Sequence, residues 1–306
     1  MKKIIKGLVF ASTLGAAAVS LASCGSNSAQ ALKIAIPSDG TNLSRGIKLL
    51  ESAGLIEVDS AAGYTPQLSD VTKYIYNIEI VPQEANTLPT LLEDYAGATI
   101  NGTYAIPTGL LPSRDGLIIE KQTSGSENPY VNIIVARTAD KDNELYKTVV
   151  EAYQSATVGE YILKEYNEAF FPQFDYDESD AVKNVVETVN NWKTTSTKEH
   201  TIKVGVCGAN NNQWNAVQYV LDTQYHDSGI YIQTVEYSAY NIPNDSLNAG
   251  EIDLNAFQHK AYLANEIKNN NYKIESIGDT LIAPLTLYSK KYKSISEIKQ
   301  AAGLVK

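Results

Sequence analysis

An arginine follows a polar turn early in the chain, in the run Thr41-Asn42-Leu43-Ser44-Arg45. Apolar residues then recur at helical spacing, so we expect Arg45 in the first turn of a helix, beside free backbone N–H groups. A guanidinium at a helix N-terminus is a natural site for a carboxylate, because the helix dipole and a bidentate donor act together. The alternative is a surface arginine that pairs with a nearby acid.

Two asparagines could present amides to a ligand. Asn101 follows an apolar run and precedes Gly102, a pair that most often marks a turn. Asn132 lies inside an apolar run, where a lone amide needs a hydrogen-bond partner. A backbone partner is the simpler explanation for Asn132.

Aromatic side chains gather in the second half of the chain. Phe257, His259 and Tyr262 are close in sequence, and His259 and Tyr262 are neighbours at i,i+3 if a helix has begun. Tyr237 and Tyr240 add aromatic surface upstream. The set could line a binding pocket; the alternative is a core aromatic patch that contains one hydrogen-bonded histidine.

Motifs for catalysis are missing from the sequence. It contains no G-x-S-x-G elbow, P-loop, G-x-G-x-x-G or H-E-x-x-H pattern, and its three histidines are too scattered for a three-histidine metal cluster. We therefore expect a binding protein without a cofactor or metal, and not an enzyme. The 25 basic and 35 acidic residues give a net charge of −10, which argues against nucleic acid as a partner.

The N-terminus predicts export. Three lysines precede a short apolar core, so residues 1–23 are typical of a signal peptide. Leu21-Ala22-Ser23-Cys24 is similar to a lipobox, which implies that Cys24 carries lipid (palmitate) and that residues 24–31 form a tether. The lipid would be the membrane anchor of an extracytoplasmic protein. An ordinary signal peptide with a chance cysteine is the alternative.

The elements that must position these residues form an α/β pattern. A strand at 32–37 precedes a turn and a helix that ends at Gly54, and a strand at 202–206 precedes a loop and a helix from Trp214. Two such openings, in a chain of 306 residues, indicate two similar α/β lobes. Further strands are expected at 78–81, 98–100, 116–120 and 131–136, with a helix over 145–153.

The segment 175–199 differs in composition. Acidic residues and a polar run flank apolar residues at helical spacing between Val182 and Trp192, which predicts a linker with one amphipathic helix. Ser294-Ile295-Ser296-Glu297 is a capping box that opens a last helix. The chain then stops at 304–306, where another strand would be natural.

Taken together, these stretches resemble the methionine-binding lipoprotein family (NlpA/MetQ type), the substrate-binding components of amino-acid ABC importers. The resemblance implies a two-lobed periplasmic-binding-protein-like fold (type II) with a ligand cleft between the lobes. The matching stretches are Ala35 to Asn42 with Arg45, Ser52 to Ile56, Ile100 to Ala105, Pro129 to Val135, Glu151 to Ser155, Asn255 to Lys260, and Tyr288 to Lys291.

The halves stand in the opposite order from the family, so the chain resembles a circular permutant. Residues 32–128 would form the family's second lobe, 129–174 a crossover and a helix returning to the other lobe, and 200–306 the remainder of the first lobe. The hinge would then keep one covalent crossover, with an open break between Lys306 and Leu32, and be looser. We favour a monomer over a swapped dimer that pairs 32–128 of one chain with 200–306 of another.

The resemblance also implies roles for the site residues. Arg45 would bind the carboxylate of L-methionine, Asn101 and Asn132 would contact the amino-acid backbone, and an importer permease would be the protein partner. The aromatic residues would line the side-chain pocket, which suits a polarisable thioether. The complete expected ligand site is Asn42, Arg45, Asn101, Tyr104, Asn132, Tyr237, Tyr240, Phe257, His259 and Tyr262.

Two departures from the family bear on the ligand. Ala209 to Asn212 stand where relatives usually carry acidic or proline-containing residues, and Ala239 stands where they usually have Asp. Another small amino acid or a methionine-containing dipeptide therefore remains an alternative ligand. A surface lipoprotein with an adhesion or decoy role on the same fold is the alternative function.

Overall fold

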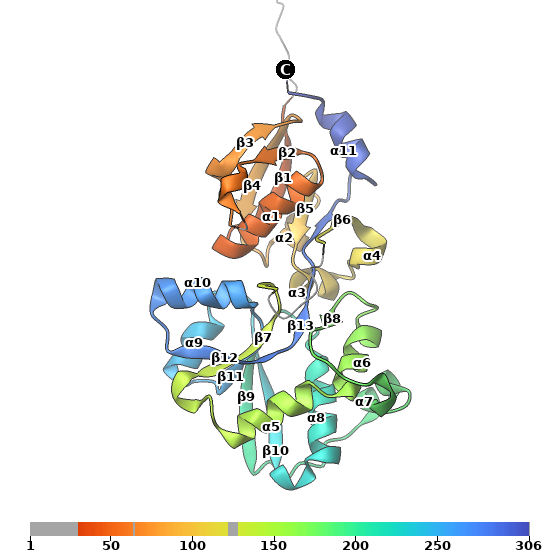
Figure 1. Ribbon diagram of the computed structural model, residues 1–306. Coiled ribbons are helices and arrows are strands. Elements are labelled where there is room, and N and C mark those ends of the chain that lie inside the picture. Colours follow the sequence, from red (N-terminus) through yellow and green to blue (C-terminus); the bar gives the residue numbers. More distant parts are fainter. Residues whose placement is uncertain (1–29, 64, 122–127, 306) are drawn as a thin grey trace, which may run out of the picture. The chain divides into compact units, whose positions relative to one another are not determined.

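The structure, a computed structural model, describes residues 30–63, 65–121 and 128–305 (Figure 1). Residues 31–306 form one compact unit. The predicted signal peptide and Cys24 lie outside the described residues. None of the helices in the described part is long and apolar enough to cross a membrane.

The first sheet is built around the apolar run at 32–37. This run forms β1, which pairs in parallel with β4 and β5, while β14 lies antiparallel between β5 and β6. In spatial order the strands are β4 (Ile78–Gln83), β1 (Leu32–Pro37), β5 (Gly97–Ile100), β14 (Thr286–Tyr288) and β6 (Gly116–Ile119).

The second sheet is built around the strand predicted at 202–206. This strand is β9, which pairs in parallel with β10 and β11, while β7 lies antiparallel between β11 and β12. In spatial order the strands are β10 (Ile230–Tyr237), β9 (His200–Cys207), β11 (Leu254–Asn255), β7 (Ile133–Arg137) and β12 (Ile274–Asp279).

Helices and two small sheets complete the fold. The two-stranded sheets pair β2 (Ile56–Val58) with β3 (Val71–Tyr74), and β8 (Phe171–Pro172) with β13 (Leu281–Ile282). The helices are α1 (Gly40–Ser52), α2 (Leu88–Leu91), α3 (Gly102–Ala105), α4 (Pro112–Asp115), α5 (Glu144–Tyr153), α6 (Ala156–Glu165), α7 (Val185–Asn191), α8 (Gln213–Gln224), α9 (Pro243–Ala249), α10 (Lys260–Asn270) and α11 (Ile295–Ala302).

Most of the expected elements are confirmed with small shifts in their bounds. The strands expected between residues 78 and 136 are β4, β5, β6 and β7, and the helix expected over 145–153 is α5. The linker helix α7 is shorter than expected, because Asn184 has a left-handed φ of 50° and Trp192 is extended. At the end of the chain, where the sequence stops short of another strand, the structure has a single bridge between Leu304 and Tyr76.

The core assigns residues to two lobes. Leu285, Leu287 and Ile298 are buried in the same cluster as Ile34 and other residues of β1 and α1. We therefore define lobe I as residues 32–121 with 284–305, and lobe II as residues 128–283. The expectation that 200–306 lies in a single lobe is wrong, since β14 pairs with β5 and β6 of lobe I.

The lobes are joined by two covalent crossovers. One runs from β6 to β7 and the other from β13 to β14, where the blue ribbon passes between the sheets in Figure 1. The chain end instead lies within lobe I. Asn77 N donates to Gly303 O at 2.9 Å, and Leu32 N donates to Asn77 O at 3.0 Å. The expected open break at the hinge is therefore wrong.

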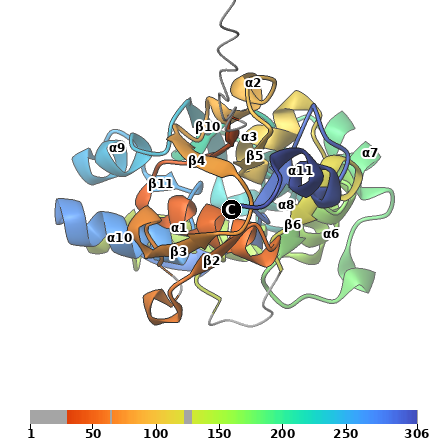
Figure 2. The same ribbon diagram turned by 90° about the horizontal axis from the view of Figure 1, so that it is seen from above.

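The lobes also meet through helices. α1 of lobe I lies beside α10 of lobe II in both views (Figure 1 and Figure 2). A hydrogen bond joins the lobes at a second place, where the Tyr104 hydroxyl of α3 donates to Ser238 O at 3.3 Å.

Candidate functional site

The candidate binding residues lie just after the carboxyl ends of strands. α1 follows the carboxyl end of β1, Asn101 follows β5, and the segment ending in His259 follows β11. Ligands of open α/β sheets bind at the carboxyl ends of parallel strands. The two crossovers contribute Asn132 and Ala283 to the same cavity.

Arg45 is buried and already paired. Its guanidinium makes a bidentate ion pair with Glu120, with Nε donating to Oε1 at 2.9 Å and Nη2 donating to Oε2. The Arg45 side chain is 3% exposed and that of Glu120 is 16% exposed. Nη1 donates to Asn42 Oδ1 at 2.9 Å, Nη2 donates to Ala283 O at 3.2 Å, and the group lies 4.8 Å from the Tyr130 ring centre.

These contacts correct the expected environment of Arg45. It lies beyond the first turn of α1, because the helix begins at Gly40 and the Asp39 carboxylate caps it by accepting from Asn42 N at 3.0 Å. The pairing with an acid that was the alternative does occur, but in the interior rather than on the surface. Burial acts to lower the pKa of Arg45, and the Glu120 carboxylate outweighs it, so the pKa is raised and the cation is retained.

Asn42 joins the polar groups of lobe I into a network. Its Nδ2 donates to both carboxylate oxygens of Asp39, at 3.0 and 3.2 Å, and its Oδ1 also accepts from Asn101 Nδ2 at 3.0 Å. Burial raises the pKa of Asp39, opposed by the hydrogen bonds from Asn42. The Oδ1 atom of Asn101 is buried with no hydrogen-bond partner among the described residues.

His259 offers a second unpartnered atom. It caps α10, with Nδ1 accepting from Tyr262 N at 3.1 Å. Burial, and then the nearby Arg45 cation, lower the pKa of His259 well below its ordinary value, so the ring is neutral. A neutral imidazole whose Nδ1 accepts must carry its proton on Nε2. That Nε2 is buried and has no partner in the described part of the chain, so it is a hydrogen-bond donor facing the cavity.

Aromatic rings form the other wall. Tyr240 lies with its ring centre 5.9 Å from that of Phe257 and 6.1 Å from that of Tyr262. Tyr104 approaches Tyr240 at 4.9 Å. Burial raises the pKa of the Tyr240 and Tyr262 phenols, so both stay neutral.

Eight of the ten expected site residues line one cavity of about 340 Å³, here called the ligand cavity. Tyr104 instead lines a neighbouring cavity beside Asp39 and Tyr240. Tyr237 lines neither of these two cavities and packs against the core of lobe II, so its place in the site stays a prediction. The eight are Asn42, Arg45, Asn101, Asn132, Tyr240, Phe257, His259 and Tyr262.

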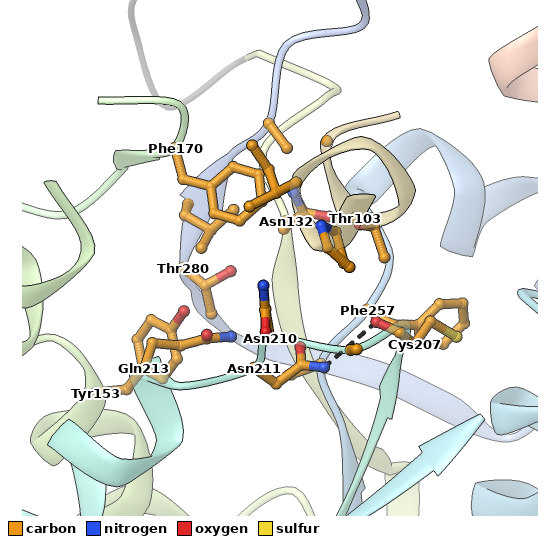
Figure 3. A pocket seen from close by; sticks show the side chains of 17 residues that line it. Thr103, Asn132, Tyr153, Phe170, Cys207, Asn210, Asn211, Gln213, Phe257 and Thr280 are labelled. Atoms are coloured by element: carbon orange, nitrogen blue, oxygen red, sulfur yellow. Dashed lines mark hydrogen bonds between the residues drawn. The ribbon is translucent and has the colours of Figure 1, made fainter. Parts of the chain in front are cut away.

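A second cavity adjoins the ligand cavity. It has a volume of about 550 Å³ and shares the walls Thr103, Asn132, Phe257 and Ala283 with the ligand cavity. Its other walls include the loop from Cys207 to Gln213, which follows β9 (Figure 3). We call it the amide chamber, from the carboxamides of that loop.

Several residues around the site are not predicted from the sequence. Glu120 ends the strand expected at 116–120, and its acidic side chain after an apolar run is the one local signal that it could pair with a buried cation. Tyr130 stacks on Arg45, and Thr103 and Gln258 line the ligand cavity. The last three lie inside stretches that carry the family resemblance.

Two α/β lobes, two crossovers and a polar cavity between the lobes define the two-lobed periplasmic-binding-protein-like fold (type II). Within that class, the family model of the NlpA lipoproteins matches residues 27–174 and 202–305. The chain belongs to the NlpA lipoprotein family.

Individual relatives match over a shorter part. The "D-methionine-binding lipoprotein MetQ" of Yersinia pestis is 44% identical over 137 residues, and that of Escherichia coli (strain K12) is 43% identical over 137 residues. In both cases the match covers 44% of this chain and 49% of the relative. The chain therefore spans about half the length of the curated relatives it matches.

Among solved structures, the "Crystal Structure of the Methionine Binding Protein, MetQ" is 42% identical, with a TM-score of 0.43. The superposition covers 45% of this chain and 56% of that chain.

Proposed function

We propose that the protein is the substrate-binding component of an amino-acid ABC importer and that it binds methionine in the ligand cavity. Membership of the NlpA lipoprotein family and the names of the relatives support this function. It is a binding function without catalysis, and the partners are a small amino acid and an importer permease. The proposed substrate and partner are those of relatives that this chain matches over about half of their length.

The observation that carries the proposal is the match between the ligand cavity and a zwitterion. Arg45 lines the ligand cavity, and the ion pair with Glu120 balances its positive charge. Within the described part of the chain, Asn101 Oδ1 has no donor and would accept from an α-ammonium, and His259 Nε2–H has no acceptor and would donate to an α-carboxylate. Buried polar atoms of this kind are normally satisfied, so a ligand that completes them is favoured.

The pairing of Arg45 with Glu120 refines the expected role of the arginine. Arg45 attracts the ligand carboxylate from within a neutral pair, in which both oxygens of Glu120 already accept from Arg45. Asn132 supplies an amide at the wall that the ligand cavity shares with the amide chamber. The whole arrangement favours a ligand that carries both charges.

The rest of the ligand cavity suits an apolar side chain. Tyr240, Phe257 and Tyr262 present rings around the space next to His259. A thioether is apolar and polarisable and makes favourable contacts with aromatic rings. Binding would stabilise the closed arrangement of the lobes through contacts to both of them.

The proposal includes the location and the chain order. Residues 1–23 would direct export and Cys24 would carry the lipid that anchors the protein outside the cytoplasm. The halves would be permuted relative to the family, and the protein would be a monomer. The closeness of Gly303 and Leu32, both bonded to Asn77, supports the permutation, because a chain cut between α11 and β1 would have its ends there.

Calorimetric titration tests the function. A soluble chain that begins at Ala31 is unfolded, dialysed free of carried-over ligand, refolded and titrated with L-methionine and D-methionine. One-to-one binding of either enantiomer is the expected result. Binding of a different small amino acid would correct the cargo, and a folded protein that binds no amino acid would favour a surface lipoprotein with an adhesion or decoy role.

A further inference from the structure

The amide chamber is built from neutral groups. Its polar lining consists of hydroxyls and carboxamides, and no Asp, Glu, Lys, Arg or His is among the described residues that line it. Burial raises the pKa of the Cys207 thiol and of the Tyr153 phenol, so these two groups also stay neutral. The chamber therefore offers hydrogen bonds without charge.

Part of this hydrogen-bonding capacity is used within the protein. Asn211 Nδ2 donates to Gly208 O at 2.7 Å, and Gln213 Oε1 accepts from the Tyr166 hydroxyl. These bonds fix the loop after β9. Asn210 adopts a left-handed φ of 67°, a conformation that asparagine tolerates well.

Other amide groups of the chamber have no hydrogen-bond partner among the described residues. Gln213 is 7% exposed, and its Nε2 makes no hydrogen bond to any described residue. The Asn210 and Asn132 side chains likewise make none within the described part. Figure 3 shows Asn210 and Gln213 directed into the chamber together with Thr280, with the Phe170 ring on its other side.

We infer that the amide chamber receives the tail of a ligand whose head occupies the ligand cavity, and that this tail is uncharged and carries hydrogen-bonding groups. The inference rests on the proposed function, because the amino-acid head must first be held beside Arg45. It extends the cargo from methionine to amino acids with a longer, neutral polar side chain.

The shared wall permits one ligand to reach both spaces. Thr103, Asn132, Phe257 and Ala283 line the ligand cavity on one side and the chamber on the other. A side chain that passes this wall would meet the amide donor of the buried Gln213, and beside it the amide of the exposed Asn210. A charged tail would lose its hydration there without gaining a counter-charge, which is costly.

A matched pair of ligands tests the inference. L-citrulline and L-arginine have nearly the same shape, but the ureido tail of citrulline is neutral and the guanidinium of arginine is charged. Titration of the refolded chain with each is expected to show binding of citrulline, and binding of arginine weaker by at least about a hundredfold. L-Methionine is titrated in parallel.

A charge introduced into the chamber should reverse this preference. Gln213→Glu keeps the size of the side chain and adds a carboxylate, so the ratio of arginine to citrulline affinity is expected to rise at least about tenfold. Asn215→Asp is the matched control, because it makes the same change two residues along α8 at an exposed position outside the chamber. In this control, the ratio of arginine to citrulline affinity should equal that of the unmodified chain.

The outcomes separate the inference from the proposed function. Methionine binding without citrulline binding would overturn the role of the chamber and leave the function standing. Absence of binding by all three ligands would remove the support for both. If Gln213→Glu does not fold, Asn210→Ala serves instead. It should lower the affinity for citrulline about tenfold, which corresponds to the loss of one or two hydrogen bonds. An unchanged affinity for citrulline would overturn the inference.

Discussion

At Arg45 the chain buries a charge together with its counter-charge. The cost of removing a guanidinium from water is met by the bidentate contact with Glu120 and by hydrogen bonds to Asn42 and Ala283. Breaking one partner of such a pair is far more damaging than removing both. The pair therefore has a structural role that is separable from ligand binding.

Replacing Arg45 should reveal both roles. Arg45→Ala is expected to lower the free energy of unfolding by about 3–5 kcal/mol, because the Glu120 carboxylate is left uncompensated. It should also weaken methionine binding by roughly tenfold to a few hundredfold, through loss of a charged hydrogen bond. Urea denaturation and calorimetry measure the two effects.

The double variant is the control for the first effect. Arg45→Ala combined with Glu120→Ala should recover part of the lost stability, since no buried charge is left alone. A double variant less stable than Arg45→Ala would contradict the pairing argument. An unchanged methionine affinity in Arg45→Ala would remove Arg45 from the ligand site.

His259 should make stability depend on pH. Its pKa is lowered in the folded state, so only the unfolded chain takes up a proton just below the ordinary value of about 6.5. Stability then falls as the pH falls below about 6.5, by about 1.4 kcal/mol for each unit until the folded-state pKa is reached. His259→Asn, which keeps a capping side chain, should lose this component. Equal pH dependence of the two chains in urea denaturation would refute the assignment.

Residue types together with the family resemblance predicted most of the residues that line the ligand cavity, but not the electrostatics of that cavity. Asn101 and His259 were expected to contact the ligand, and each does leave a buried atom unfilled at the ligand cavity. Glu120 could not be paired with Arg45 from the sequence, because 75 residues separate them and only the fold brings them together. Tyr237, a strand residue near the site, packs against the core of lobe II and does not line the ligand cavity.

Among the elements, the last helix, α11, has the N-terminal cap that its sequence predicts. Ser294 caps α11 by accepting from Glu297 N at 3.2 Å, as the capping box predicts. The helix carries Ile298 into the core of lobe I. The cap therefore helps to hold the end of the chain in place.

Removal of this cap should have a modest, measurable cost. Ser294→Ala is expected to lower the free energy of unfolding by about 1 kcal/mol. Ser296→Ala is the matched control, since Ser296 is exposed within the same helix and alanine favours helix there. Thermal or urea denaturation measures both, and equal effects of the two variants would rule out the cap.

Local sequence patterns predicted the helices and strands better than they predicted which strands pair and which lobe each belongs to. The apolar runs of β1 and β9 and the helical spacing in α5 were sufficient to predict these three elements. The residues buried on one face recur with the period of the strand or helix, and that period is visible in the sequence. The lobe to which β14 belongs was not predictable in this way. A three-residue strand carries little pattern, and its pairing with β5 and β6 is set by the crossover at 283–285.

Across the whole molecule, the proposed permutation makes a direct prediction. A reordered chain, with residues 200–306 followed by 32–194, would join Lys306 to Leu32 and would cut the polar run before β9. The new junction is short, because Gly303 and Leu32 are both bonded to Asn77. We expect it to fold, to remain a monomer by light scattering and to bind methionine as the natural chain does. Keeping residues up to 194 retains α7, whose Val185 and Val189 are buried in the core of lobe II.

The outcome distinguishes the alternatives. A stable dimer of the natural chain would support the swapped arrangement instead of the monomer. A reordered chain that fails to fold, while the natural chain folds, would show that the order of the halves matters to the fold and would weigh against permutation.

The division of lobe I between the two ends of the chain has a consequence in time. Lobe II is encoded without interruption from 128 to 283, whereas the core of lobe I needs Leu285, Leu287 and Ile298 from the last part of the chain. During synthesis from the N-terminus, residues 32–121 therefore cannot complete their core until residues 284–305 have been made. We expect lobe II to be complete while the exposed strands of lobe I still depend on chaperones.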